Sequence, residues 1–314
     1  MNNKLSPYQL GATLYMPATR SDLLEVILEQ KIPDLRSLVI CLEDAIAEHE
    51  VEAALVNLYA CLEVLYHTER RVKPLVFVRP RHPQMALNLL QEKCICVLDG
   101  LVLPKFDHDS FPDWQRVIEA APTSFCFMPT LETAQILDAH AVRELRLRLQ
   151  QAGLKSRILV LRIGGNDLLA CLQLRTDPQH TLYDGPLAYV IGMLIAQFIP
   201  AGFRLTAPVF ESFRDHQVLK AEFKRDLLHG LVGKTVIHPS QIPIIHQALK
   251  VTQNDYLAAK KILTNNVPAV FQFNGAMCEP STHQNWASQV LERAKYFGCH
   301  MSEGAVSSSL SVAL

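Results

Sequence analysis

The stretch SLVICLED, residues 37–44, decides the fold, because an apolar run of strand length is followed at once by two carboxylates, Glu43 and Asp44. An apolar run without polar alternation predicts a strand buried on both faces, which is typical of a parallel sheet covered by helices. The same arrangement recurs along the chain, where short apolar runs alternate with longer helix-like segments. This alternation predicts repeated βα units.

Eight apolar runs are strand candidates. They are residues 12–16, 37–42, 74–78, 100–103, 124–128, 158–163, 203–207 and 231–237, with helical patterns between them at 22–30, 51–67, 133–151, 187–198 and 215–229. Eight βα repeats predict an α/β fold in which a (β/α)₈ TIM barrel closes on itself, because closure leaves no strand edge exposed. A doubly wound open sheet is the alternative, but no GxGxxG follows any of the strands to support it.

The pattern changes after His238-Pro239. We therefore predict a barrel domain over residues 1–250 and a C-terminal helical lid extension over residues 251–314. The extension is expected to hold helices near 248–263 and 285–297 with an irregular segment between them. The Ser-rich end, residues 302–314, is expected to be a mobile tail.

The composition indicates which kinds of binding partner and which cellular compartment to expect. The 314 residues carry 30 basic and 31 acidic side chains, and this net charge of −1 argues against nucleic acid as a partner. The longest uncharged stretch, residues 187–203, contains Gln197 and Pro200, which favours a buried core helix over a membrane span. The eight scattered cysteines form no CxxC pair, so we expect buried reduced thiols in a cytoplasmic protein.

Polar residues follow nearly every predicted strand. They are Glu43, Asp44, Arg79, Arg81, Lys105, Glu132, Asn166, Asp167, Glu211 and His238. In a TIM barrel the carboxyl ends of the strands meet at one face, where active sites lie. Each residue taken alone has the alternative interpretation of a solvated loop charge, whereas their convergence predicts a site.

Two features of this face suggest specific chemistry. Glu132 and Asp167 follow neighbouring strands, so their carboxylates are placed to share a magnesium ion, with waters and substrate oxygens as further ligands. The alternative is that each carboxylate pairs with a local arginine or caps a helix. Arg79 is placed to hold a substrate carboxylate or enolate oxygen with its planar fork, or to form an ion pair with Glu43 or Asp44.

Read in order, these strand ends resemble the HpcH/HpaI aldolase and citrate lyase beta-subunit family, which includes malyl-CoA lyases. The segments that carry the resemblance are LYMPATR (14–20), ICLEDAI (40–46), FVRPR (77–81), GLVLPK (100–105), PTLETA (129–134), RIGGNDLL (162–169) and VGKTVIHPSQI (232–242). The last of these is the most specific. Pro80 and Arg81 depart from the family pattern, which leaves the substrate open.

The resemblance implies that Glu132 and Asp167 bind Mg²⁺ and that Arg79 is catalytic and contacts the substrate oxygens. Lys105, Glu43 and Asp44 would line the substrate site, the two acids holding waters of the metal. The implied protein is a homo-oligomer, a trimer or hexamer, and a magnesium-dependent carbon–carbon lyase. Its substrate would be a small oxo or hydroxy acid or the CoA thioester of one, with CoA then part of the substrate.

Residues 273–294 resemble the C-terminal lid segment of the longer family members, in which Glu279 takes the place of an aspartate. The resemblance implies that Glu279 acts as a general acid–base from a neighbouring subunit. The alternative is that Glu279 flanks the following helix, where its charge favours the helix N-terminus. Two other functions remain open: a CoA-thioester hydrolase using the same site, and a noncatalytic subunit that binds metal or ligand.

Overall fold

The computed structural model describes residues 5–69 and 74–300. Eight parallel strands form one sheet in the order β7-β6-β5-β4-β3-β2-β1-β8. The strands are β1 (Ala12–Pro17), β2 (Ser37–Cys41), β3 (Leu75–Arg79), β4 (Gly100–Leu103), β5 (Cys126–Leu131), β6 (Leu161–Ile163), β7 (Leu205–Thr206) and β8 (Lys234–Val236). A parallel bridge between Ala207 and Lys234 joins the two ends of this order, which closes the barrel.

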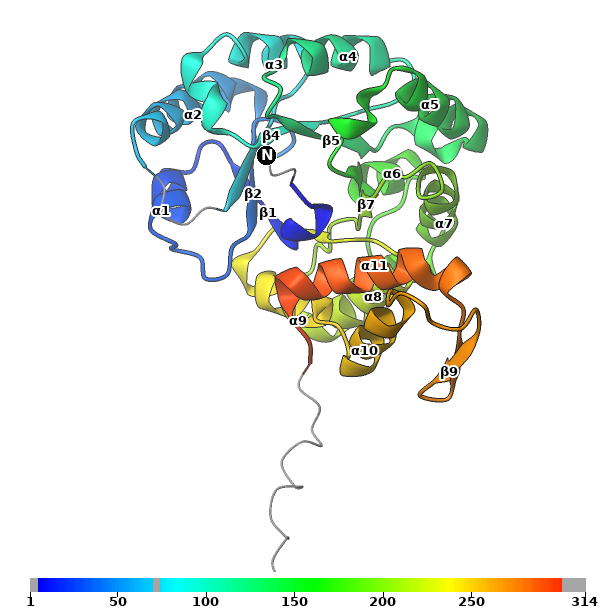
Figure 1. The fold of residues 1–314 in the computed structure, drawn as a ribbon. Helices are drawn as coiled ribbons and strands as arrows, with labels where there is room; N and C mark the ends of the chain where they lie inside the picture. Colours follow the sequence, from blue (N-terminus) through cyan, green and yellow to red (C-terminus); the bar gives the residue numbers. More distant parts are fainter. Residues whose placement is uncertain (1–4, 70–73, 301–314) are drawn as a thin grey trace, which may run out of the picture. The chain divides into compact units, whose positions relative to one another are not determined.

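Helices surround the sheet in the first part of the chain (Figure 1). They are α1 (Leu23–Leu28), α2 (Val51–Tyr66), α3 (Pro83–Leu89), α4 (Phe111–Ala120), α5 (Ala139–Gln151), α6 (Gly165–Cys171), α7 (Leu187–Phe198), α8 (His216–Leu228) and α9 (Ile242–Leu249). Because one helix or more follows each strand, consecutive parallel strands lie side by side without a buried edge. The predicted (β/α)₈ barrel is confirmed.

Burial explains why the strands form where the apolar runs stand. β2 is buried at every position, as a strand with a barrel interior on one face and helices on the other must be. Its register places Val39 beside Tyr15 of β1 and Phe77 of β3. β6, β7 and β8 are shorter than predicted, at two or three residues each. The ladder is therefore shortest where the two ends of the sheet meet.

Packing divides the chain into two compact units, residues 1–245 and 246–314. The second unit contains α10 (Gln253–Ile262), β9 (Phe271–Phe273), β10 (Ala276–Cys278) and α11 (Pro280–Phe297). Its core packs α10 against α11 through Ala259, Ile262, Ala287 and Val290. The predicted mobile tail lies outside the described residues, and the predicted boundary after residue 250 stays a prediction.

Two expectations for the second unit were wrong. The helix expected at 248–263 is interrupted after Leu249 and restarts at Gln253, because Thr252 caps α10 through its side-chain oxygen. The segment expected to be irregular contains the β9–β10 hairpin. Asn274 and Gly275 both have positive φ in its two-residue turn, which is the backbone that an Asn-Gly hairpin turn requires.

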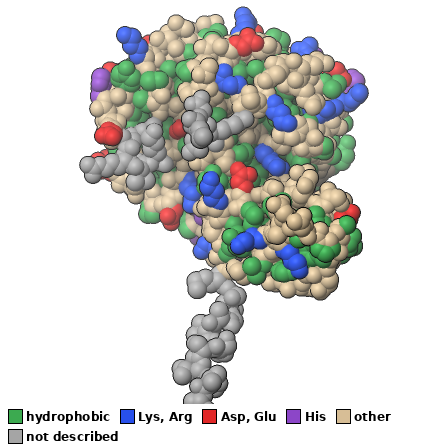
Figure 2. Space-filling model, viewed as in Figure 1, with side chains coloured by type: hydrophobic (Ala, Val, Ile, Leu, Met, Phe, Trp, Pro, Cys, Tyr) green, Lys and Arg blue, Asp and Glu red, His purple; other side chains and the backbone are tan. Residues whose placement is uncertain are grey.

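The exposed residues test the predictions about the cysteines and the surface charge. Cys96 and Cys171 are exposed, so the prediction of uniformly buried thiols was wrong, although the structure has all eight cysteines free. Basic and acidic side chains are interspersed on the face drawn in Figure 2, as the near-zero net charge leads one to expect. Within residues 5–69 and 74–300, no helix has both the length and the apolar character needed to cross a bilayer.

Candidate active site

A cavity of about 460 Å³ lies where the barrel strands end. Its lining includes Tyr15, Asp44, Arg79, Thr130, Glu132, Arg162, Asp167 and Thr235. Four strands or the segments that follow them supply these charged members, namely β2, β3, β5 and β6, with Asp167 in α6 directly after β6. The barrel therefore gathers residues that lie far apart in the sequence around one cavity, as the strand-end pattern predicts.

Arg79 is the last residue of β3, and it is 7% exposed. Its Nη2 forms ion pairs with Glu43 and with Asp44, the latter at 2.6 Å. The predicted alternative, an ion pair with the two acids after β2, is therefore present. Arg79 Nε is also buried and has no hydrogen-bond partner among the described residues, so the guanidinium keeps a donor for a ligand.

Arg81, one of the departures from the family pattern, holds the loop that carries the two acids. Its Nη1 donates to the carbonyl oxygens of Ile46 at 3.0 Å and Leu42 at 3.2 Å. Its Nη2 pairs with Glu48 at 2.8 Å. An arginine with planar donors can brace three points of one loop, here the loop that carries Glu43 and Asp44.

Lys105 connects the two predicted metal ligands. Its backbone N–H donates to Glu132 Oε1 at 2.8 Å, and its ammonium pairs with Asp167 Oδ1. Lys105 has φ of +51°, a left-handed conformation that is uncommon for a side chain of this size and that clusters at functional sites. Gly164 packs directly against the Glu132 side chain, so that any Cβ at position 164 would collide with the carboxylate.

Burial sets the charge states in this cluster. Burial of the Glu132 carboxylate raises its pKa from 4.5 to about 7, although the Arg79 guanidinium opposes the shift. Burial also raises the pKa of Glu43, again against Arg79. Burial alone would lower the pKa of Lys105, but Glu132 and Asp167 beside it hold that pKa above its ordinary range.

The donor set fits a magnesium ion and not a zinc ion. Among residues 5–69 and 74–300, no group of three or more His, Cys, Asp and Glu side chains is placed to hold a metal. A pair of carboxylates is nevertheless what magnesium requires, because magnesium keeps several waters and takes substrate oxygens as further ligands. The buried Glu132 carboxylate, with its raised pKa, would gain most from a cation beside it.

Glu211 lies at the edge of the same cavity. Its carboxylate accepts hydrogen bonds from Asn166 Nδ2 at 2.9 Å and from Thr176 Oγ1. A second cavity of about 720 Å³ shares Arg175, Val209 and Glu211 with the first. The two cavities are therefore neighbours, and Glu211 stands between them.

Polar residues inside the barrel were not predicted from the sequence. Arg162 is 1% exposed in β6 and lines the cavity with Tyr15, Thr130 and Thr235. A signal was available, because an arginine within the apolar run ILVLRI contradicts the composition of a plain buried strand. His238, a predicted strand-end residue, is the N-cap of the 3₁₀ helix Pro239–Gln241. Its ring stacks on the Phe213 ring, with 4.9 Å between the ring centroids.

Glu279 lies in the second unit, where it is the N-cap residue of α11. Its Oε1 accepts a hydrogen bond from Ser281 Oγ at 3.0 Å, and its backbone N–H donates to His283 Nδ1 at 3.1 Å. This placement agrees with the alternative interpretation of a residue flanking a helix. A catalytic role for Glu279 stays a prediction.

Several known proteins are similar to this chain in sequence or in fold. The chain is 24% identical over 290 residues to the citrate lyase beta subunit of Haemophilus influenzae, covering 90% of this chain and 96% of that protein. It is 24% identical over 246 residues to the (3S)-malyl-CoA thioesterase of Cereibacter sphaeroides, covering 78% of each. The CitE protein of Mycobacterium tuberculosis, solved with magnesium, acetoacetate and coenzyme A, shares the fold with a TM-score of 0.64 and 21% identity, over 92% of this chain and 99% of that one.

A family model extends the likeness over almost the whole chain. The model for C–C bond lyases of the TIM-barrel fold matches residues 4–299, which include every strand end that contributes to the cavity. The chain therefore belongs to the family of carbon–carbon bond lyases with the TIM-barrel fold.

Proposed function

We propose that this protein is a magnesium-dependent carbon–carbon lyase or aldolase. Its substrate would be a small oxo or hydroxy acid, or the CoA thioester of one, and the reaction would pass through an enolate. The observation that carries the proposal is the meeting of Glu132 and Asp167 at Lys105, beside buried Arg79 and in one cavity. Family membership and the titles of the relatives support the class of reaction.

Glu132 and Asp167 would hold the metal ion. When bound, magnesium supplies Lewis acidity at the substrate oxygens and fixes their position. Glu132 would hold its charge through the Lys105 N–H and would be kept in place by the close approach of Gly164. Glu43 and Asp44, which flank this pair, would orient waters around the site.

Arg79 would bind the substrate oxygen that gains negative charge. Its two carboxylate partners fix the guanidinium at Nη2, and the unpartnered Nε remains as a donor. A donor that is already oriented stabilises developing charge without reorganising during the reaction. Lys105 would add a second positive charge at the same edge of the cavity.

The second cavity would take the CoA arm if the substrate is a thioester. It is larger than the first, at about 720 Å³, and meets it at Arg175 and Glu211. The relative from Mycobacterium tuberculosis was solved with coenzyme A, which supports this assignment. A thioester bond near Glu211 would then place the acyl group toward Glu132 and Asp167.

A CoA-thioester hydrolase is the second candidate, because one relative is a malyl-CoA thioesterase. Incubation with Mg²⁺ and candidate 3-hydroxyacyl-CoA esters or 2-oxo acids separates the possibilities. A lyase releases a carbonyl acid such as glyoxylate, pyruvate or oxaloacetate and leaves the thioester intact. A hydrolase releases free thiol without a carbonyl product. Binding of metal and ligand with neither product would overturn both and favour a noncatalytic subunit.

A further inference from the structure

Arg162 lies inside the barrel on β6, in a row of polar side chains. The strand register pairs it with Thr130 of β5 and with Thr206 of β7. It is among the largest fully buried side chains of the protein, at 1% exposed. Arginine is rarely buried to this degree unless it is paired with an acid.

The partners of Arg162 are all uncharged. Its Nη2 donates to Thr235 Oγ1 at 2.5 Å, its Nη1 lies 3.5 Å from Thr13 Oγ1, and its Cζ is 5.3 Å from the centre of the Tyr15 ring. No carboxylate of residues 5–69 or 74–300 lies within ion-pair distance of Arg162. Arg79, in contrast, is held by both Glu43 and Asp44.

Burial of the Arg162 guanidinium is unfavourable, because no ion pair within residues 5–69 or 74–300 offsets its desolvation and the charge of Glu132 acts on it only from beyond ion-pair distance. Hydroxyl groups satisfy its donors but do not neutralise its charge, and burial lowers the pKa of Arg162 from its ordinary value. Charge-assisted hydrogen bonds to an anion would repay this desolvation. A site that must bind an anion gains from a cation kept ready in this way.

The cavity gives an anion access to Arg162. The same 460 Å³ space is lined by Arg79, Glu132, Asp167 and Arg162. Thr130 Oγ1, beside Arg162 in the register, is buried and has no hydrogen-bond partner in the described part of the chain. Arg79 Nε is the other unpartnered polar atom at this cavity. Two atoms of the lining are therefore available to hydrogen-bond a ligand.

We propose that Arg162 is a specificity-determining residue, which with Arg79 makes the site select a small acid bearing two carboxylates over an acid bearing one. One carboxylate would bind Arg79 at the end of β3. The other would extend into the barrel and bind Arg162 together with Thr130. The proposal rests on the proposed function only in taking the substrate to be a small acid. It adds the class of that acid, a dicarboxylate.

Malate and lactate test the proposal, because these two 2-hydroxy acids differ by a distal carboxylate against a methyl group. Calorimetric titration of each acid, with both enantiomers, into the full chain in Mg²⁺ buffer gives the two affinities. We expect the unmodified protein to bind one enantiomer of malate at least about tenfold more tightly than lactate. We expect Arg162→Met to remove that preference and to leave lactate affinity within about threefold.

Arg157→Met is the matched control. Arg157 precedes the same strand, and burial lowers its pKa as well, but it donates to the carbonyl oxygens of Phe125 and Pro122. Its replacement should leave the preference for malate unchanged. Arg162→Lys, which keeps a cation, should retain part of the preference and serves if Arg162→Met does not fold.

Two results would overturn the proposal. The first is an unmodified protein that binds malate and lactate equally, and the second is a folded Arg162→Met variant that keeps the preference. Failure of the proposed function looks different. Magnesium-independent binding of both acids would contradict the metal site, whereas the malate preference and its loss in Arg162→Met would still stand.

Discussion

Two groups of charged residues in the barrel domain differ in burial and in how completely their polar atoms are hydrogen-bonded. The edge cluster consists of Glu43, Asp44, Arg79, Lys105, Glu132 and Asp167. The β8 cluster consists of Lys234, Glu222, Asp226 and Tyr183. In the β8 cluster the Lys234 ammonium lies 2.8 Å from an oxygen of each acid, and the three charged side chains are at most 1% exposed.

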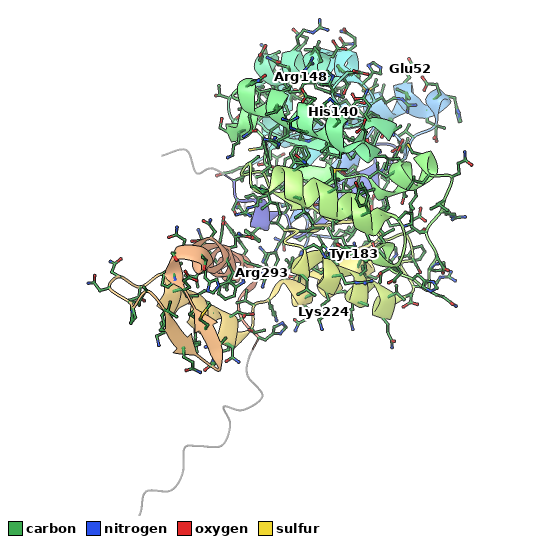
Figure 3. All side chains as sticks on the ribbon, turned by 90° about the vertical axis from the view of Figure 1, so that its right-hand side faces the viewer. Glu52, His140, Arg148, Tyr183, Lys224 and Arg293 are labelled. Atoms are coloured by element: carbon green, nitrogen blue, oxygen red, sulfur yellow. The ribbon has the colours of Figure 1, made fainter. Side chains whose placement is uncertain are left out.

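Every carboxylate oxygen of the β8 cluster has a partner. The second oxygen of Glu222 accepts from the Leu182 N–H at 2.8 Å, and the second oxygen of Asp226 accepts from Tyr183 Oη at 2.7 Å. Tyr183, labelled in Figure 3, belongs to the short 3₁₀ helix before α7, and both acids belong to α8, as does the labelled Lys224. A network satisfied in this way stabilises the fold and leaves no carboxylate oxygen without a partner.

The edge cluster retains what the β8 cluster lacks. Arg79 Nε has no hydrogen-bond partner among the described residues and lies at the 460 Å³ cavity. Burial raises a carboxyl pKa in both clusters, that of Glu132 to about 7 and that of Asp226 as well. The same residue types therefore serve two purposes in one barrel. Full pairing of a buried group indicates a structural role, whereas an unused buried donor at a cavity indicates a site.

The largest effect on stability is expected for Lys234→Met. Removal of the ammonium leaves Glu222 and Asp226 buried without compensation, so the free energy of unfolding should fall by about 3–5 kcal/mol in urea denaturation. Lys224→Met, an exposed position on the same helix as the two acids, is the control and should stay within about 0.5 kcal/mol. A loss below about 1 kcal/mol for Lys234→Met would contradict the structural role of the β8 cluster.

Glu132 is expected to act on stability with the opposite sign. Its folded pKa of about 7 lies above the ordinary 4.5, so the folded state holds the proton more tightly and is stabilised at low pH. That stability is full below about pH 4.5 and is lost as pH rises through about 7, by about 3 kcal/mol in all. In metal-free protein, Glu132→Gln should therefore become more stable relative to the unmodified chain between about pH 5 and pH 8.

Urea denaturation in a chelating buffer at several pH values measures this difference. Subtracting the two curves removes the groups that titrate alike in both proteins. A difference independent of pH would mean that Glu132 is ionised throughout and that burial does not oppose its charge.

Arg79→Lys is expected to separate function from folding. Lysine keeps a charge near Glu43 and Asp44 but not the planar fork, so stability should change by about 1 kcal/mol or less while turnover falls at least about tenfold. Thermal unfolding and product release by the same preparation check both halves. An unfolded Arg79→Lys protein would place Arg79 with the β8 cluster, as a residue that holds the fold.

Glu279→Gln should have the smallest effect on stability, about 0.5 kcal/mol, because the side chain sits at a partly exposed helix N-terminus. If the lid role holds, the variant keeps Mg²⁺ affinity and loses turnover. Mixing it with inactive Glu132→Gln then restores activity only when two chains share a site. Full activity in Glu279→Gln alone would exclude the acid–base role.

The barrel and most of the edge cluster were predictable from the sequence, because each depends on local order: an apolar run and then a charged residue. Arg162 was not predicted, because its neighbours in the run led us to assign a plain strand, and only the register shows its row of threonines. The β9–β10 hairpin was missed despite Asn274-Gly275, a strong turn signal, since both of its strands are short. Pairing across the barrel, such as Lys105 with Asp167, depends on long-range geometry that spacing does not contain.

Magnesium binding tests the central claim, that the edge cluster is a metal-centred active site, most directly. Calorimetric titration of Mg²⁺ into the unmodified chain, Glu132→Gln, Asp167→Asn and the exposed-acid control Glu52→Gln compares four folded proteins at about pH 8. We expect about one ion per chain in the unmodified protein and in the control, and at least about tenfold weaker binding in the other two variants. Unchanged affinity in both Glu132→Gln and Asp167→Asn, with folding intact, would contradict the claim.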